Sequence, residues 1–436
     1  NLSIELQGAS QIQALTEVDD DGGFDDVDIK LGSANIDINT RTTDATDVTL
    51  DANSVSSGNT VTIGGAGAAE VFNVNDGVTV DAQTGLTGGV DMTGSLDVFT
   101  GSLSSGDAVT VKTGSAQTTV VGDGAASATV SVAANKLLQA AGTNNNDLIL
   151  RGTTALVVTA LNADLLAATT SGVIDVTTVD DADADTLDLR TGSGEFTLTG
   201  VDSQDTMLID ADDLTSGATL VLDGSSTMTV ANVASGVTVD ANGDGAGAAL
   251  SGVLTIDLDA SATSVNVLSG VAATTVNTFT GGDVSVNATA LADDTLLTLT
   301  GAADATVTGL IGDVDASTLS GALDITTANN TDANAIAIEL GSGQTSIDAY
   351  INDVVTIDAE VQDDNDVLTL TGDGSFVVNN QDGNIDAASG TGTLTASLKT
   401  PGDDTITVES DRTTTVNSGL LETDNSLVLA GSGDIT

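Results

Sequence analysis

The sequence predicts an all-β protein folded as a parallel β-solenoid, in which short strands wind around one axis in successive coils. Three observations predict this fold: short alternating strands at close intervals, repeated segments, and a core that uses small and branched side chains instead of aromatic ones. A solenoid is the architecture that stacks such units, because each coil buries its apolar face against the next.

The strands are visible as runs of β-branched and aliphatic residues that alternate with polar ones, separated by Gly, Asp, Asn, Ser and Thr. Clear examples are residues 78–80, 196–199, 219–222 and 296–300. Alternation with period two indicates strands, and between residues 185 and 327 they recur about every 10 residues. Proline occurs only at Pro401, so almost every backbone N–H is able to join a ladder.

Repeated segments set the expected size of a coil. The hexamer Gly-Val-Thr-Val-Asp-Ala occurs at 77–82 and at 236–241, and a looser motif joins an aliphatic residue to Asp-Ala. The Asp of this motif stands at Asp51, Asp81, Asp210, Asp240, Asp259, Asp315, Asp348, Asp358 and Asp386. Several gaps between motifs are about 30 residues, and Ser-Gly motifs recur in steps of about 18. We therefore expect coils of roughly 18 to 30 residues, with two strands in the shorter coils and three in the longer ones.

The composition of the core separates the solenoid from its main alternative, a string of tandem β-sandwich domains. Sandwiches also show strands at short intervals, but their cores rely on large aromatic side chains. Here 40% of the residues are hydrophobic and only 2% are aromatic, which favours the solenoid. No linker interrupts the pattern, so we expect one continuous solenoid over residues 1–436. The chain begins with Asn1 and shows no signal peptide, and we interpret it as a processed form or a section of a longer protein.

The charge excludes several classes of partner. Eight Lys and Arg residues face 64 Asp and Glu residues, for a formal net charge of −56. A protein with so few basic residues is not expected to bind nucleic acid or an anionic membrane surface. No run of about 18 apolar residues predicts insertion into a membrane. Self-repulsion destabilises a compact chain of this charge, so we expect bound divalent cations. The alternative is a solvated acidic surface in a salty environment.

Carboxylates are the only abundant functional group, and Ca²⁺ is the ion that clustered oxygen ligands prefer. Two clusters stand out because their oxygen-bearing residues alternate within a short segment. One consists of Asp181, Asp183 and Asp185. The other consists of Asp240, Asn242 and Asp244, which match the first half of the EF-hand calcium loop, although Ser251 stands where that loop needs Glu. For each cluster the alternative is a set of turn residues without a metal.

Three further segments resemble calcium-binding units of the repeats-in-toxin family. They are 142–149 (GTNNNDLI), 365–370 (NDVLTL) and 402–408 (GDDTITV). This resemblance implies Ca²⁺ ligands at Asp147, Asp366, Asp403 and Asp404. More broadly, the Thr-, Ala-, Gly- and Asp-rich composition is similar to that of bacterial surface-layer proteins built from calcium-dependent β-solenoids.

The sequence argues against an enzyme. His and Cys are absent, which excludes catalytic triads and dyads that depend on them. Paired carboxylates can cleave glycosides, and a polysaccharide-degrading β-helix enzyme remains the least favoured alternative. The single Tyr350 and eight scattered basic residues offer little for binding a sugar or a uronate.

These observations predict a structural subunit of an extracellular surface assembly, such as a surface layer, a sheath or a filament, stabilised by calcium. We expect the chain to associate with copies of itself at the cell surface, with a cell-surface glycan as a further candidate partner. The alternative is an adhesin or a phage-type fibre stalk.

Overall fold

The computed structural model confirms an all-β parallel β-solenoid with two parallel sheets and coils of roughly 21 residues. It describes the backbone of residues 2–5 and 10–12, and in full residues 27–40, 48–83, 91–137, 147–181, 184–243, 248–279, 282–329, 335–362, 366–399, 405–421 and 426–436. The chain divides into two compact units, residues 1–221 and 222–436, and each has the same construction.

Unit 1 contains strands of both sheets. Its odd-numbered strands are β1 (Leu2–Glu5), β3 (Val27–Lys30), β5 (Val48–Asp51), β7 (Ala69–Val74), β9 (Leu96–Thr100), β11 (Thr118–Gly122), β13 (Leu148–Gly152), β15 (Leu165–Thr170), β17 (Thr186–Arg190) and β19 (Thr206–Asp210). Its even-numbered strands are β2 (Ser10–Ile12), β4 (Ile36–Thr40), β6 (Thr60–Gly65), β8 (Thr79–Asp81), β10 (Ala108–Lys112), β12 (Thr129–Ala133), β14 (Ala155–Leu161), β16 (Ile174–Thr178) and β18 (Phe196–Gly200). The division between the units falls within β20 (Thr219–Gly224).

Unit 2 continues the alternation. Its odd-numbered strands are β21 (Thr227–Val233), β23 (Leu254–Leu258), β25 (Thr274–Asn277), β27 (Leu296–Gly301), β29 (Asp313–Leu319), β31 (Ile336–Glu339), β33 (Val354–Asp358), β35 (Ser375–Gln381), β37 (Thr393–Leu398) and β39 (Thr413–Asn417). Its even-numbered strands are β22 (Thr238–Asp240), β24 (Ser264–Leu268), β26 (Asp283–Asn287), β28 (Asp304–Leu310), β30 (Leu323–Thr327), β32 (Thr345–Ala349), β34 (Val367–Gly372), β36 (Asn384–Ala387), β38 (Thr405–Ser410) and β40 (Ser426–Ala430).

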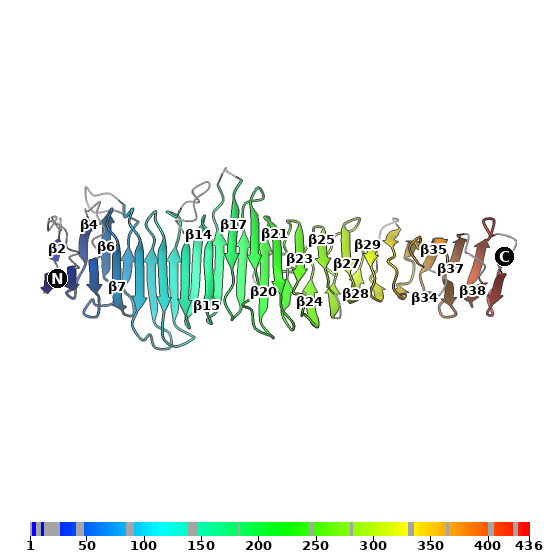
Figure 1. The fold of residues 1–436 in the computed structure, drawn as a ribbon, viewed down its shortest axis with the longest axis horizontal. Coiled ribbons are helices and arrows are strands. Elements are labelled where there is room, and N and C mark those ends of the chain that lie inside the picture. Colours follow the sequence, from blue (N-terminus) through cyan, green and yellow to red (C-terminus); the bar gives the residue numbers. More distant parts are fainter. Residues whose placement is uncertain are drawn as a thin grey trace. The chain divides into compact units, whose positions relative to one another are not determined.

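Each coil contributes one strand to each sheet. Within each unit an odd-numbered strand pairs in parallel with the next odd-numbered strand, as β11 does with β13, and the even-numbered strands pair likewise, as β10 does with β12 (Figure 1). The expectation of three strands in the longer coils is wrong. Asp81 and Lys112 lie 31 residues apart, yet they stand on the paired strands β8 and β10 with only β9 between them. The extra residues of a long coil therefore lie in its turns.

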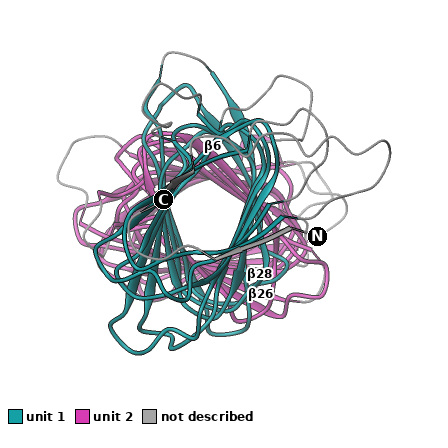
Figure 2. Ribbon diagram, turned by 90° about the vertical axis from the view of Figure 1, so that its left-hand side faces the viewer, with its two compact units in different colours: residues 1–221 teal, residues 222–436 magenta. Residues whose placement is uncertain are grey.

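The core lies between the two sheets, because alternate residues of each strand point inward. Burial alternates along β12, for example, with Val130 and Val132 buried and their neighbours partly exposed. Val, Leu, Ile and Ala make up most of the core, and Phe196 and Phe376 are its largest aromatic residues. Figure 2 shows the backbone of each unit wound around a centre.

The repeated aliphatic-Asp-Ala motif lies at or near the end of a strand at most of its positions, and inside β29 at Asp315. In eight of its nine occurrences the Asp Oδ1 accepts a hydrogen bond from the backbone N–H two residues later, which is the geometry of an Asx turn. These residues are Asp51, Asp81, Asp210, Asp240, Asp259, Asp315, Asp358 and Asp386. The following Ala is buried at most of these positions, so the motif turns the chain while a small side chain fills the corner.

A second recurring device is a β-bulge with a residue of positive φ. Asn73, Asn232 and Asn380 have φ angles of 56°, 60° and 57°, and Ala160 occupies the same place in β14 with φ of 54°. The register with the next strand shifts at each of these bulges. Asn73 and Asn380 also donate from Nδ2 to the Asx-turn aspartates Asp51 and Asp358 of the preceding coil, at 3.0 Å in both cases.

The described part of the chain has strands and turns only, and it contains no long apolar helix of the kind that crosses a membrane.

Candidate functional site: two acidic groups in unit 1

Two of the aspartates expected to bind metal meet two others in a corner of unit 1. Asp181 and Asp185 lie in the turn between β16 and β17, while Asp202 and Asp205 lie in the turn between β18 and β19, one coil later. Asp205 Oδ1 accepts a hydrogen bond from the Asp185 backbone N–H at 3.0 Å, which joins the two turns. We name these four residues the corner cluster.

Burial makes the corner cluster electrostatically unfavourable when it is fully ionised. Asp202 and Asp205 are each only 4% exposed. The pKa of Asp205 is raised, first by desolvation and then by the negative charges of Asp202, Asp185 and Asp181, and the hydrogen bond from Asp185 only partly opposes this. A proton or a cation would relieve this repulsion.

A second acidic group forms a column across three strands of the odd-numbered sheet. Leu148 of β13 pairs with Leu165 of β15, and Leu165 pairs with Leu189 of β17. The residue before each of these leucines is an aspartate, so the pairing aligns Asp147, Asp164 and Asp188 on successive coils. We name these three residues the aspartate column.

The aspartate column is also held together by its own contacts. Asp188 donates its backbone N–H to Asp164 Oδ1 at 2.9 Å. The pKa values of Asp147 and Asp188 are both raised, mainly by desolvation and then by the charge of Asp164. Carboxylates on adjacent strands lie about 4.8 Å apart at the backbone, a spacing that concentrates negative charge.

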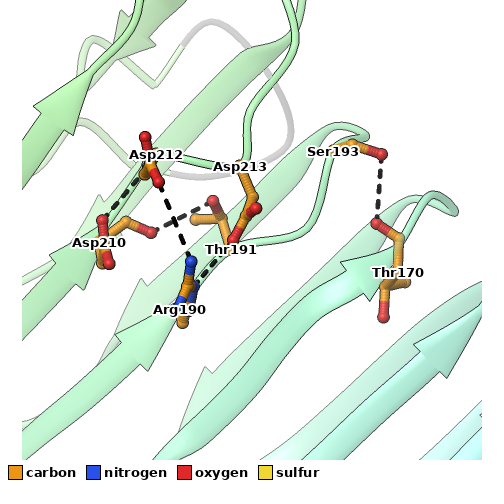
Figure 3. Close-up of polar contacts among 7 residues, drawn as sticks. All are labelled: Thr170, Arg190, Thr191, Ser193, Asp210, Asp212 and Asp213. Carbon is orange, nitrogen blue, oxygen red and sulfur yellow. Dashed lines mark hydrogen bonds and ion pairs between the residues drawn. The ribbon is translucent and has the colours of Figure 1, made fainter. Parts of the chain in front are cut away.

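Arg190, a basic residue on the same strand as Asp188, forms its ion pairs with two other aspartates. Arg190 donates from Nε to Asp213 Oδ2 at 2.8 Å, and its Nη2 lies 3.9 Å from Asp212 Oδ2 (Figure 3). The hydrogen bond to Asp213 is the largest cause of the raised pKa of Arg190. Asp212 and Asp213 follow β19, so this ion pair links two coils beside the acidic groups.

Of the remaining expected ligands, the structure describes Asp240, Asn242 and Asp366, and each makes its own local hydrogen bond. Asp240 and Asn242 form an Asx turn, in which the Asn242 N–H donates to Asp240 Oδ1 at 3.0 Å. Asp366 is buried, and its Oδ1 accepts from Gln344 Nε2 at 3.1 Å. Asp183, Asp244, Asp403 and Asp404 lie outside the described residues.

Sequence reasoning missed Asp164, Asp188, Asp202 and Asp205, which complete the two acidic groups. No local motif connects them to Asp147, Asp181 or Asp185, because the partners lie on neighbouring coils. The column could have been found by aligning the coils on their inward-pointing leucines. The residue before each of these leucines is then an aspartate.

The chemistry of both groups is that of oxygen ligands. Among the described residues, no three acidic side chains already stand in an arrangement that could hold a metal ion. Any ion bound here would therefore draw the carboxylates together. The fold brings negative charges close to one another but does not preform a coordination site.

Comparison with protein-family models, with curated proteins and with solved structures finds no match to this chain.

Proposed function

We propose that the chain is a structural, non-catalytic solenoid of an extracellular surface assembly, in which Ca²⁺ neutralises carboxylates of successive coils. The observation that supports this most is the corner cluster, where burial and then the charges of three neighbouring carboxylates raise the pKa of Asp205. A fold that gathers like charges in this way is stabilised by any cation that binds between them.

Calcium fits the available ligands better than other common metals. The chain has no His and no Cys, so its metal ligands are oxygens. Ca²⁺ accepts six to eight oxygen ligands in flexible geometry, which suits carboxylates that must reorient, whereas Mg²⁺ demands a nearly ideal octahedron. Extracellular Ca²⁺ sites bind at about 10⁻⁴ to 10⁻³ M, a range that links assembly to ambient calcium.

The regular solenoid supports the structural part of the proposal. Repeat proteins present long, uniform surfaces, and their stability is the sum of contacts between neighbouring repeats. Such a molecule suits a load-bearing or lattice-forming role, with its acidic exterior keeping single copies soluble.

Electron microscopy of the purified chain tests the proposal. At pH 7 and about 1 mM Ca²⁺ we expect ordered filaments or sheets, and after addition of a chelator we expect single particles. Mg²⁺ at matched ionic strength is the control and should restore the assemblies poorly. Single particles in every condition would contradict the assembly role, and assemblies that resist the chelator would contradict the role of calcium.

A further inference from the structure

The outer face of the odd-numbered sheet in unit 1 carries a continuous apolar stripe. On β9, β11 and β13 the outward residues Phe99, Val121 and Arg151 stand in register, and Phe72 of β7 lies beside Phe99 where the register between β7 and β9 shifts. The rings of Phe72 and Phe99 stack with centroids 4.6 Å apart and planes 4° apart. In the neighbouring row Ile149 of β13 pairs with the exposed Leu166 of β15.

One row on the odd-numbered strands of unit 2 is polar instead. On β21, β23, β25 and β27 one in-register outward row consists of Thr229, Thr255, Thr275 and Thr298. Hydroxyl groups of that kind need no partner beyond water. Phe72, Phe99, Val121 and Ile149 are partly exposed, and Leu166 is exposed. Apolar side chains that gather on an outer face in this way are typical of an interaction surface.

Charges of opposite sign flank the stripe. Arg151 is exposed at one side, and it forms no ion pair with any residue that the structure describes. Asp97 stands on the other side, on β9, two residues before Phe99. The central strand β11, with Thr119 and Val121 outward, separates them.

We propose that this stripe is a lateral contact between two copies of the chain, related by a two-fold axis parallel to the strands and passing over β11. Such an axis reverses the order of the strands, so β13 of one copy lies over β9 of the other. Arg151 then reaches Phe99 and Asp97 of the second copy, and the same contact forms twice.

The charges of Arg151 and Asp97 favour a second copy of the chain as the partner that covers this stripe. The axis brings each unpaired Arg151 to an acidic group beside an aromatic ring, where a guanidinium gains from both. Thr119 and Val121 of β11 lie between the two charge pairs, and the axis brings Val121 of one copy against Val121 of the other. This inference rests on the proposed self-assembly, and it names one surface by which copies associate.

A charge-swap experiment on the full chain tests the contact. Sedimentation equilibrium at about 0.15 M salt, where long-range repulsion is screened, measures the dimerisation constant. In Arg151→Asp the new carboxylate faces Asp97 of the second copy, and in Asp97→Arg the new guanidinium faces Arg151 of the second copy. Each variant should weaken dimerisation about tenfold or more. The double variant Arg151→Asp with Asp97→Arg should recover to within about threefold of the original, because the pairs re-form in reverse.

Asp175→Arg is the matched control, since it makes the same charge change as Asp97→Arg on β16 of the other sheet. It should leave dimerisation unchanged, and circular dichroism should show that all variants keep the fold. A chain that stays monomeric at every concentration would overturn the inference. So would single variants that dimerise normally, or a double variant that fails to recover.

The test is distinct from that of calcium-dependent assembly. If chelation abolishes ordered assemblies while the swap results hold, both proposals stand. If assemblies form equally well with and without calcium but the charge-swap variants behave as expected, only the calcium proposal fails. If assemblies depend on calcium and ignore the swaps, the lateral contact alone is wrong.

Discussion

Ala160 is the residue whose backbone least suits its side chain. It adopts φ of 54° at a bulge where β7, β21 and β35 have asparagine. An L-residue with a Cβ pays about 1–2 kcal/mol in this left-handed region, whereas glycine pays none and asparagine tolerates it.

Ala160→Gly should therefore raise the free energy of unfolding by about 0.5–1 kcal/mol, after allowing for the greater flexibility of glycine in the unfolded chain. Chemical denaturation measures the change. The matched control is Ala231→Gly, one residue before the bulge residue Asn232, where φ is not positive. It should lower stability, and a loss of stability in both variants would refute the strain at Ala160.

The Asx turns explain the recurring Asp of the sequence better than metal binding does. Asp358 Oδ1 accepts hydrogen bonds from the Glu360 N–H at 3.2 Å and from Asn380 Nδ2 at 3.0 Å. Asp348 stands in the same Ile-Asp-Ala context and is exposed, and it is the one occurrence for which no Asx turn is found.

Asp358→Ala should lower stability by about 1–2 kcal/mol, because two donors lose their acceptor. Asp348→Ala should change it by less than about 0.5 kcal/mol, as is usual for an exposed position. Thermal unfolding of the two variants checks this difference. Equal losses would show that the Asx turn is not what stabilises the motif.

At the scale of elements, the strands could be predicted from the sequence and the coils only in part. Period-two alternation reveals each strand, since inward Val, Leu and Ile alternate with outward polar residues. The predicted number of strands per coil was wrong for the longer repeats, because a long turn and an additional strand produce the same spacing between repeated motifs. The step from β8 to β10 shows this ambiguity.

The candidate site was predictable to a smaller extent. Asp147, Asp181 and Asp185 were expected as ligands, and they do lie in acidic groups. Their partners Asp164 and Asp205 come from neighbouring coils, and only the register of the strands shows which coils align. Asp240 begins a segment that matches the first half of a calcium loop, and it forms an Asx turn, which uses the same residue types.

The acidic groups predict how stability depends on pH. The pKa values of Asp147, Asp188 and Asp205 are raised in the folded state, so these three groups bind more protons in the folded chain than in the unfolded chain. The free energy of unfolding should therefore fall as pH rises through their titration toward neutrality. Without divalent cations, the unfolding midpoint should be higher at about pH 5 than at pH 7.

Asp205→Asn isolates the corner cluster within that pH effect. The amide Oδ1 can still accept from the Asp185 N–H, but the charge is removed. The unfolding midpoint should rise at pH 7, and the gain should shrink as the pH falls. Asp175→Asn, which changes an exposed strand residue, is the control. A gain that is independent of pH, or a loss at pH 7, would contradict the electrostatic account.

At the scale of the whole molecule, a net charge of −56 is the property that the fold must accommodate. Repulsion spread over 64 acidic groups weakens a compact state, and the few ion pairs, such as Lys112 with Asp81 at 2.8 Å, offset little of it. Cations from solution are the remaining source of neutralisation. Both the stability of the single molecule and its association with other copies should then depend on divalent ions.

Thermal unfolding of the full chain at pH 7, in about 1 mM Ca²⁺ and again with excess chelator at the same ionic strength, tests this dependence most directly. The account predicts that calcium raises the unfolding midpoint by several degrees, and that Asp205→Asn reduces the gain. An unfolding midpoint that is the same with calcium and with chelator would contradict it.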